Sequence, residues 1–348
     1  MKSNIHSSSY NSASAVFWMR AWLLVLGLMV YAMILVGGAT RLTDSGLSIT
    51  EWDPIAGALP PMSEAAWIAL FEKYKQTAEY QLQNKGMSLS EFEFIYWWEW
   101  GHRLLGRVIG LVAVLGYVVF AVKGWLQRGL KWKFLALIFL GGLQGFIGWW
   151  MVASGIGETN RVDVAPYRLM VHFSLALLII CYIYWLWQDI TLKTVRHRSS
   201  GLVFPVLLVL VFLQMASGAL VAGMDAGRTY TDWPRMAGEF FPTGYWMPEL
   251  GLLNLVENQA TVQFNHRMLA YVIVAVIVAV LFWFKSALGR YGLRLVAFLI
   301  ALQVVWGILT LINVAPLHLA LVHQGIGVLV LLSCVRTVWR SGHNTGYN

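Results

Sequence analysis

The sequence predicts an all-α polytopic membrane protein. Of its 348 residues, 58% are hydrophobic and only 12% are charged, whereas about a quarter of the residues in soluble domains are charged. Apolar runs of about 20 residues, long enough to cross a bilayer core as a helix, recur along the chain. We expect eight membrane-spanning helices, at about 17–39, 95–122, 132–154, 167–188, 202–223, 262–285, 292–312 and 317–338.

The segment before the first span is polar and rich in serine, and it leads directly into a full-length span. A cleaved signal peptide has a shorter apolar core and a small-residue cleavage site, so we expect a short disordered tail instead. Both cysteines, Cys181 and Cys334, fall within spans. The sequence therefore predicts neither a disulfide framework nor a cysteine-based metal site.

The distribution of lysine and arginine predicts the orientation in the membrane. Short loops on the side of the N-terminus, such as 123–133 and 189–201, are strongly basic, and Asp189 is the one acid on that side. By the positive-inside rule, these loops and both termini are expected in the cytoplasm. The formal net charge of +8 thus follows from topology and requires no nucleic-acid partner; the expected surroundings are membrane lipid.

Two polar loops reveal an internal repeat. "DSGLSITEWDPIAGALPP" follows the first span and "DAGRTYTDWPRMAGEFFP" follows the fifth. One constant offset relates the matching pairs Asp44/Asp225, Gly46/Gly227, Thr50/Thr231, Glu51/Asp232, Trp52/Trp233, Ala56/Ala237, Gly57/Gly238 and Pro61/Pro242. Chance similarity of apolar helices does not explain matches in polar loops, so we predict a tandem duplication of four spans.

Because four is an even number, both halves enter the membrane from the same side. The sequence therefore predicts two tandem four-helix bundles related by a parallel pseudo-two-fold axis along the membrane normal, unlike the inverted repeats of many transporters. We place the halves at 1–195 and 196–348, with a linker near 189–201 and a long outer loop at 40–94.

That long outer loop carries two local signals. In "SEAAWIALFEKYKQTAEYQ", the apolar residues Trp67, Leu70, Phe71 and Tyr74 recur at helical spacing, which predicts an amphipathic helix on the outer surface. The "SLSE" at 88–91 resembles a capping box and predicts that the second span begins above the membrane. The repeated loops themselves fit lids, a contact surface or simple turn chemistry, and the sequence does not choose among them.

Four histidines begin the second, fourth, sixth and eighth spans: His102, His172, His266 and His323. These spans all run from outside to inside, so the four lie at similar depth near the outer face. Ionisable residues within spans mark function, and one pair per half suits the two axial positions of a haem iron. The other histidines are expected to be solvated or interfacial: His6, His197, His318 and His343.

Two other metal sites fit less well. Glu99-x-x-His102 matches the di-iron carboxylate signature, but its repeat mate is Gln263-x-x-His266 and spans four and eight contain no glutamate. Zinc would lack ligands with two histidines per half. Haem also gives a role to nearby arginines as propionate partners, although interfacial snorkelling is an alternative. These arginines are Arg103, Arg107, Arg168 and Arg267.

The motifs "EWGHR", "VHFSLALL", "FNHRMLAY" and "LVHQGIGVL", within eight spans in two halves, together resemble the haem A synthase family over about 17–340. The resemblance implies an oxidoreductase that converts a methyl group of haem o to a formyl group through hydroxylated intermediates, giving haem a for cytochrome oxidase. It also implies a cofactor haem b on His266 and His323, and substrate haem o on His102 and His172.

Some members of that family carry a cysteine pair in the first outer loop, which this chain lacks. The chain thus resembles the branch typical of Gram-negative bacteria and mitochondria, and we expect a bacterial inner membrane location. Expected partners are haem o synthase and cytochrome oxidase assembly factors. The electron donor, the oxygen source and the oligomeric state, a homo-oligomer included, stay open.

Glu99 lies one turn from His102 on the same helix face, whereas its repeat mate, Gln263, has no charge to lose or gain. Our hypothesis is that Glu99 stabilises positive charge developing at the oxidised methyl group or accepts a proton there. The alternative is that Glu99 only orients an imidazole or a propionate network.

Two rival functions remain for the whole chain. A di-haem cytochrome b could pass electrons without any methyl oxidation, but a symmetric relay needs no single carboxylate. A transporter or haem carrier is disfavoured by the parallel repeat and by the lack of charged residues at mid-membrane.

Overall fold

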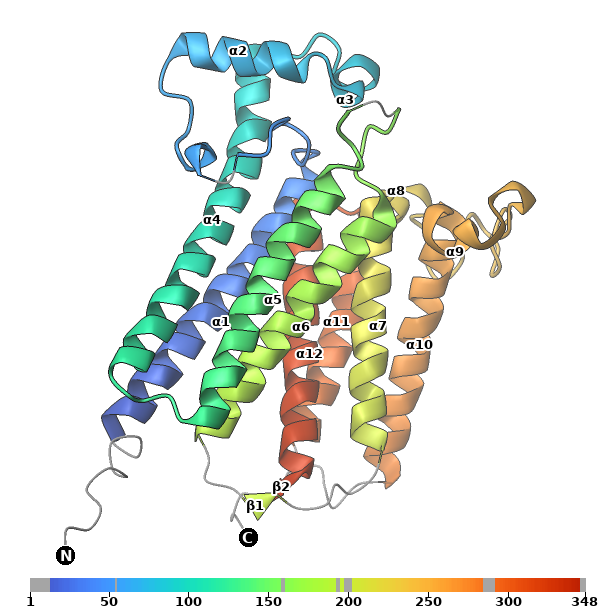
Figure 1. Cartoon of the computed structure of the whole chain (residues 1–348). Coiled ribbons are helices and arrows are strands. Elements are labelled where there is room, and N and C mark those ends of the chain that lie inside the picture. The colour runs from blue at the N-terminus through green and yellow to red at the C-terminus, as the bar shows by residue number, and fades with distance from the viewer. Residues whose placement is uncertain are drawn as a thin grey trace, which may run out of the picture.

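The computed structural model describes residues 13–53, 55–157, 160–191, 195–196, 202–283 and 292–344. Eight helices of the described chain are long and apolar enough to cross a membrane, which confirms the predicted polytopic all-α class. They run side by side as a bundle (Figure 1). They are α1 (Ala13–Leu42), α4 (Leu89–Val122), α5 (Arg128–Val152), α6 (Pro166–Thr191), α7 (Val203–Gly223), α10 (Gln259–Trp283), α11 (Leu293–Ile312) and α12 (Leu317–Ser341).

Short helices gather at one end of the bundle, which we call the cap end (Figure 1). They are η1 (Ala56–Ala58), α2 (Glu64–Tyr74), α3 (Ala78–Leu82), α8 (Ala226–Thr229), η2 (Pro248–Leu253) and α9 (Asn254–Glu257). At the opposite end, α1 begins and α12 ends, and β1 (Val195–Arg196) pairs antiparallel with β2 (His343–Asn344). The predicted N-terminal tail, His6, His197 and most of the linker lie outside the described residues.

Within each half, the four long helices contact one another in the same cyclic order. Helix α1 packs on α4 and α6, and α5 packs on the same two helices; α7 packs on α10 and α12, and α11 does likewise. The halves join where α6 meets α7 and where α12 meets α1 and α6. The predicted duplication would produce this order, and the duplication, its axis and the half boundaries stay predictions.

The apolar core lies at the junction of the halves. Leu23 and Leu26 of α1, Leu177 of α6, and Val328 and Leu331 of α12 are almost fully buried there. By contrast, α4 and α5 bury little of their apolar surface. Because exposed apolar helices of this length are expected to face lipid, α4 and α5 lie on the outside of the bundle. The more deeply buried helices α1, α6, α7 and α12 form the protein interior.

Arg41, at the cap end of α1, ties the halves together. Its guanidinium is 9% exposed and lies 2.8 Å from Asp44, 2.8 Å from Asp225 and 3.4 Å from Asp163, and it also donates to the Gly223 carbonyl. Asp44 and Asp225 are repeat mates, and both have the same left-handed backbone, with φ of 50°. The start of the repeated loop motif in each half therefore binds one shared arginine.

An Arg41→Leu variant is expected to lose about 2 kcal/mol of unfolding free energy. Removing the cation leaves three carboxylates facing one another, and this cost lies below that of a fully buried pair because the carboxylates are about one-third exposed. Thermal unfolding of the purified protein in detergent measures it. Arg228→Gln is the matched control, because Arg228 is exposed and, among the described residues, pairs with one carboxylate, that of Asp225, at 3.3 Å. Equal losses in the two variants would contradict the prediction.

The amphipathic segment of the first outer loop packs against protein. Phe71 and Tyr74 of α2 are buried against Phe92, Ile95 and Tyr96, on the part of α4 nearest the cap end. The predicted amphipathic helix is confirmed as α2, which contains all four of its apolar residues. The short helix α3 follows it, because the Thr77 side chain accepts from the Tyr80 N–H and caps a new helix start. The predicted capping box at Ser88 and Glu91 is confirmed, and it begins α4 well before its apolar stretch.

A buried carboxyl group, that of Glu79, makes the stability of the segment formed by α2 and α3 depend on pH. Burial raises the pKa of Glu79 to about 8, with Tyr74 opposing the shift and Glu99, Asp163 and Asp44 adding to it. From about pH 4.5 to about 8, the folded chain holds a proton that the unfolded chain has released. Stability of this segment is therefore expected to fall with rising pH, by at most about 1.4 kcal/mol per unit, and to level off above about 8.

Hydrogen exchange of residues 64–82, corrected for the intrinsic effect of pH, measures this dependence. Glu79→Gln is expected to abolish the slope, whereas Glu72→Gln, at an exposed site on α2, should keep it. A slope that survives in Glu79→Gln would assign the titration to another group.

Candidate haem sites

The structure brings the four candidate histidines together as two pairs. His102 of α4 is close enough to His172 of α6 for their charges to interact, and the same is true of His266 of α10 and His323 of α12. These are the pairs expected from the sequence. His318, in contrast, is exposed at the cap end of α12.

Each of these histidines faces a glycine on a neighbouring helix. The pairs are Gly37 of α1 with His102, Gly148 of α5 with His172, Gly218 of α7 with His266, and Gly307 of α11 with His323. A Cβ atom on Gly307 would lie 2.8 Å from the His323 ring, and one on Gly218 would lie 3.3 Å from the His266 ring. The glycines therefore provide space that the imidazoles need, in both halves.

Glutamine amides accompany three of the four rings. Gln144 Nε2 lies 3.2 Å from His172 Nδ1, Gln214 Nε2 lies 3.1 Å from His266 Nδ1, and Gln303 Nε2 lies 3.4 Å from His323 Nε2. The Oε1 atoms of all three glutamines are buried with no partner among the described residues, as is His323 Nδ1. Unsatisfied polar atoms are costly in an apolar interior. Their clustering around the rings indicates a space prepared for another group.

The donor set fits a haem better than a bare metal ion. Among the described residues, no group of three or more His, Cys, Asp or Glu side chains gathers to hold an ion. A haem iron takes only two protein ligands, because the macrocycle supplies the others. Two neighbouring imidazoles per half, with glycine clearance at all four rings and orphaned amides beside three of them, match that requirement.

Glu99 is almost fully buried, and its carboxylate faces the outer loop. It accepts from Ser48 Oγ at 2.7 Å and from the Ile49 N–H at 2.8 Å, while Arg103 donates to its other oxygen at 2.7 Å. One turn further along α4, no hydrogen bond from the described residues reaches the His102 ring. The carboxylate is therefore held in place by the loop and by Arg103.

Gln263 binds the repeated loop of the second half, but as a donor, whereas Glu99 binds the loop of the first half as an acceptor. Its Nε2 donates to the Tyr230 carbonyl at 2.8 Å, and Tyr230 is the repeat mate of Ile49. The loop thus donates an N–H to Glu99 in the first half and offers a carbonyl to Gln263 in the second. The sequence predicted the difference in charge but not this reversal.

Two of the arginines assigned to propionates anchor the repeated loops. Arg103 donates to the Ile49 and Glu51 carbonyls at 3.1 and 3.0 Å. Arg267 donates to the carbonyls of Tyr230 and Asp232, the repeat mates of those two residues, at 2.8 and 3.0 Å. The repeated motif is therefore a loop clamped over the histidine pair in each half, a role that sequence reasoning left unassigned.

The other two arginines lie at the same end. Arg107 donates to the Asp53 carbonyl at 2.9 Å. Arg168 donates to the Trp150 carbonyl at 2.8 Å, with its guanidinium 4.6 Å from the centre of the Trp150 ring. The four arginines lie on three of the histidine helices, α4, α6 and α10, and their contact with propionates stays a prediction.

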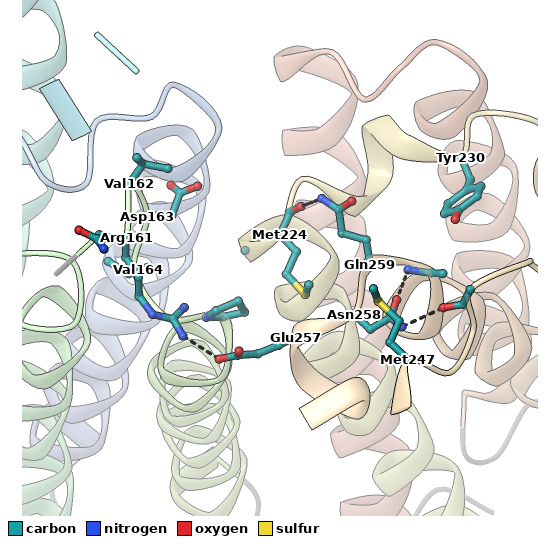
Figure 2. Close-up of a pocket in the computed structure, with 15 residues that line it drawn as sticks. Arg161, Val162, Asp163, Val164, Met224, Tyr230, Met247, Glu257, Asn258 and Gln259 are labelled. Atoms are coloured by element: carbon teal, nitrogen blue, oxygen red, sulfur yellow. Dashed lines mark hydrogen bonds and ion pairs between the residues drawn. The ribbon is translucent and has the colours of Figure 1, made fainter. Parts of the chain in front are cut away.

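A cleft of about 690 Å³ opens at the cap end between the two halves. Arg161, Asp163 and Pro166 line one side, and Met224, Tyr230 and Gln259 line the other. Figure 2 shows the Arg161 guanidinium directed toward the Glu257 carboxylate, 2.9 Å away. None of the four histidines lines this cleft, so it is separate from the rings while bordering the Tyr230 loop.

The fold and this site define a multi-pass helical membrane protein with one histidine pair in each half. Residues 20–335 match the family described as cytochrome oxidase assembly protein. Curated relatives are the heme A synthases of Hyphomonas neptunium, 60% identical over 95% of both chains, of Caulobacter vibrioides, 46% identical over 92% of this chain and 94% of the relative, and of Maricaulis maris, 44% identical over 95% and 98%. The chain belongs to the haem A synthase family.

Proposed function

We propose that this chain is a haem A synthase that oxidises a methyl group of haem o to a formyl group through hydroxylated intermediates, giving haem a for cytochrome oxidase. The observation that carries the proposal is the asymmetry between two similar halves. Both hold a histidine pair under a clamped loop, but only the first has a carboxylate, Glu99, where the second has the neutral Gln263.

In this proposal the second half holds the cofactor, and His266 and His323 are the residues that would bind the iron of a haem b. Once bound, that haem supplies one-electron transfer. Gly218 and Gly307 leave room for the imidazoles, and Arg267 holds the loop above them. The neutral Gln263 adds no titratable group beside a site whose task is electron transfer alone.

The first half holds the substrate haem o, with His102 and His172 as ligands. Gly37 and Gly148 give the rings clearance, and Arg103 and Arg168 lie at the cap end, where propionates need cations. The Glu99 carboxylate, fixed by Ser48, Ile49 and Arg103, is the group that accepts a proton from the oxidised methyl carbon or its oxygen, or stabilises positive charge there.

A second function is favoured by one observation. Every contact of the Glu99 carboxylate described above is to the loop or to Arg103, so Glu99 could serve only to clamp the loop. In that case the chain would be a di-haem cytochrome b that passes electrons without oxidising a methyl group.

Haem analysis separates these functions. The protein is purified from cells that also contain a haem o synthase, and its haems are extracted and identified by mass spectrometry. Haem b together with haem o, a hydroxylated haem or haem a supports the synthase. Two molecules of haem b per chain would support the electron-transfer protein, and the absence of any haem would overturn both.

We also propose that the cap end faces the outside of a bacterial inner membrane, with both termini in the cytoplasm. Support comes from the basic loops at the opposite end. A haem o synthase is then the expected source of the substrate, and haem o would reach the first half from within the membrane.

A further inference from the structure

Only one of the four candidate rings is bound by a hydroxyl group in the described structure. Ser217 Oγ of α7 lies 2.8 Å from His266 Nδ1 and also 2.8 Å from the Gln214 carbonyl oxygen. A carbonyl only accepts, so the single hydroxyl proton of Ser217 goes to Gln214. The Ser217 oxygen then accepts from an Nδ1–H of His266, while the Gln214 amide beside that ring donates to the His266 carbonyl at 3.0 Å. In this tautomer Nε2 of His266 carries no proton and is the nitrogen that would bind iron.

The first half cannot make this bond. The offset that relates Asp44 to Asp225 relates Val36 to Ser217 and Met33 to Gln214. A valine has no acceptor and a methionine offers only a weak one, and no hydrogen bond from the described residues reaches the His102 ring. Gly37 and Gly218, one residue further along, both lie against their histidines, but a Cβ on Gly37 would be nearest His102 Nε2 and one on Gly218 nearest His266 Cε1. The glycine contact is therefore shared, whereas the ring orientation and the hydroxyl differ.

The other pair of histidines shows no such difference. His172 has Gln144 and His323 has Gln303 at corresponding places, and neither ring contacts a hydroxyl among the described residues. A hydroxyl that binds the imidazole is therefore found only on the α7 side of the second half, among the described residues.

We propose that Ser217 anchors His266 so that the second half retains its haem permanently, and that Val36 leaves His102 without an anchor so that the haem of the first half can be exchanged. This inference rests on the proposed function, in which one haem is a cofactor and the other is substrate and then product. The inference adds that Ser217 makes the second site retain its haem and that Val36, which offers no acceptor, lets the first site release its haem.

The physical reason lies in the ring N–H. A histidine that donates its second ring nitrogen to a fixed acceptor is held in one tautomer and orientation and becomes a more basic ligand. Loss of such an acceptor typically costs about 10- to 100-fold in metal affinity. An enzyme that must release its product gains from lacking that acceptor at the product site.

Transfer of haem to an excess of apomyoglobin tests the proposal. Purified holoprotein carrying both haems is mixed with the apomyoglobin, and loss of each haem is followed by absorbance and by extraction. Ser217→Ala is expected to release the haem of the second half about tenfold faster and to shift its midpoint potential upward, because a less basic ligand stabilises the oxidised iron less. Ser217→Thr, which keeps the hydroxyl, should restore both values.

Two further variants complete the design. Val36→Ser is expected to slow release from the first half about tenfold, because a serine there places its hydroxyl against the Met33 carbonyl as Ser217 does against Gln214. Ser333→Ala, on α12, is the matched control, because Ser333 is a buried serine whose hydroxyl donates to the Val330 carbonyl, as Ser217 does to Gln214. It should leave both release rates and the potential unchanged.

The outcomes separate this inference from the proposed function. Unchanged release and potential in Ser217→Ala, with haem still bound through His266, would overturn the anchoring role while leaving the synthase intact. A holoprotein that keeps both haems after His266→Ala would overturn the proposed function itself. Faster release that Ser217→Thr does not restore would show a packing defect and would also contradict the proposal.

Discussion

A Glu99→Gln variant is expected to bind its haem substrate and yet to form haem a at least about a hundredfold more slowly, the usual loss when a general base is removed. The amide keeps the shape of the side chain but cannot take up a proton or carry a negative charge. Quantifying haem o, hydroxylated haems and haem a in the purified variant measures the effect. Accumulated haem o in the first half is the expected signature.

Because Glu99 also fixes the loop through hydrogen bonds, the control variant must weaken that fixation and keep the Glu99 carboxylate. Ser48→Ala does so, since it removes the hydrogen bond to Glu99 and leaves those from Ile49 and Arg103. We expect it to cost about 1 kcal/mol of stability and to retain most haem a formation. Normal haem a formation in Glu99→Gln, or equal losses in both variants, would assign Glu99 to loop fixation.

The sequence predicted the spans and the histidine pairs because both follow from local rules. A span needs only length and apolar composition, and the depth of His102, His172, His266 and His323 follows from where each span begins. The capping box at Ser88 is equally local, since both partners lie within one turn. Such features depend on neighbours in sequence, which a single chain displays.

The contacts that clamp the loops join residues far apart in sequence, often through backbone carbonyls. Arg103 reaches Ile49, and Arg41 reaches Asp163 and Asp225; no side-chain pattern marks a carbonyl as an acceptor. The repeat contained one usable signal: Gly37 matches Gly218 at the same offset as the loops. A glycine retained in both halves within a span indicates close packing, and the structure shows that a histidine fills the space.

His266→Ala and His102→Ala are each expected to remove one haem, and the losses should differ in kind. Without His266, the cofactor haem has a single ligand and is lost, so haem extracted from the protein should be haem o alone. Without His102, haem b should stay and haem o should be absent. Optical spectra and extraction measure both, with His318→Ala, at the exposed cap end of α12, as the control that keeps the wild-type content.

The direction of these losses tests the assignment of the halves, which rests on Glu99 and on the family. If His102→Ala lost haem b and kept haem o, the cofactor would lie beside the carboxylate and substrate beside Gln263. The anchor at Ser217 argues against that arrangement, because the hydroxyl would then hold the product more firmly than the cofactor. In the proposed arrangement, retention at Ser217 and chemistry at Glu99 fall in different halves, as an enzyme with one resident and one exchangeable haem requires.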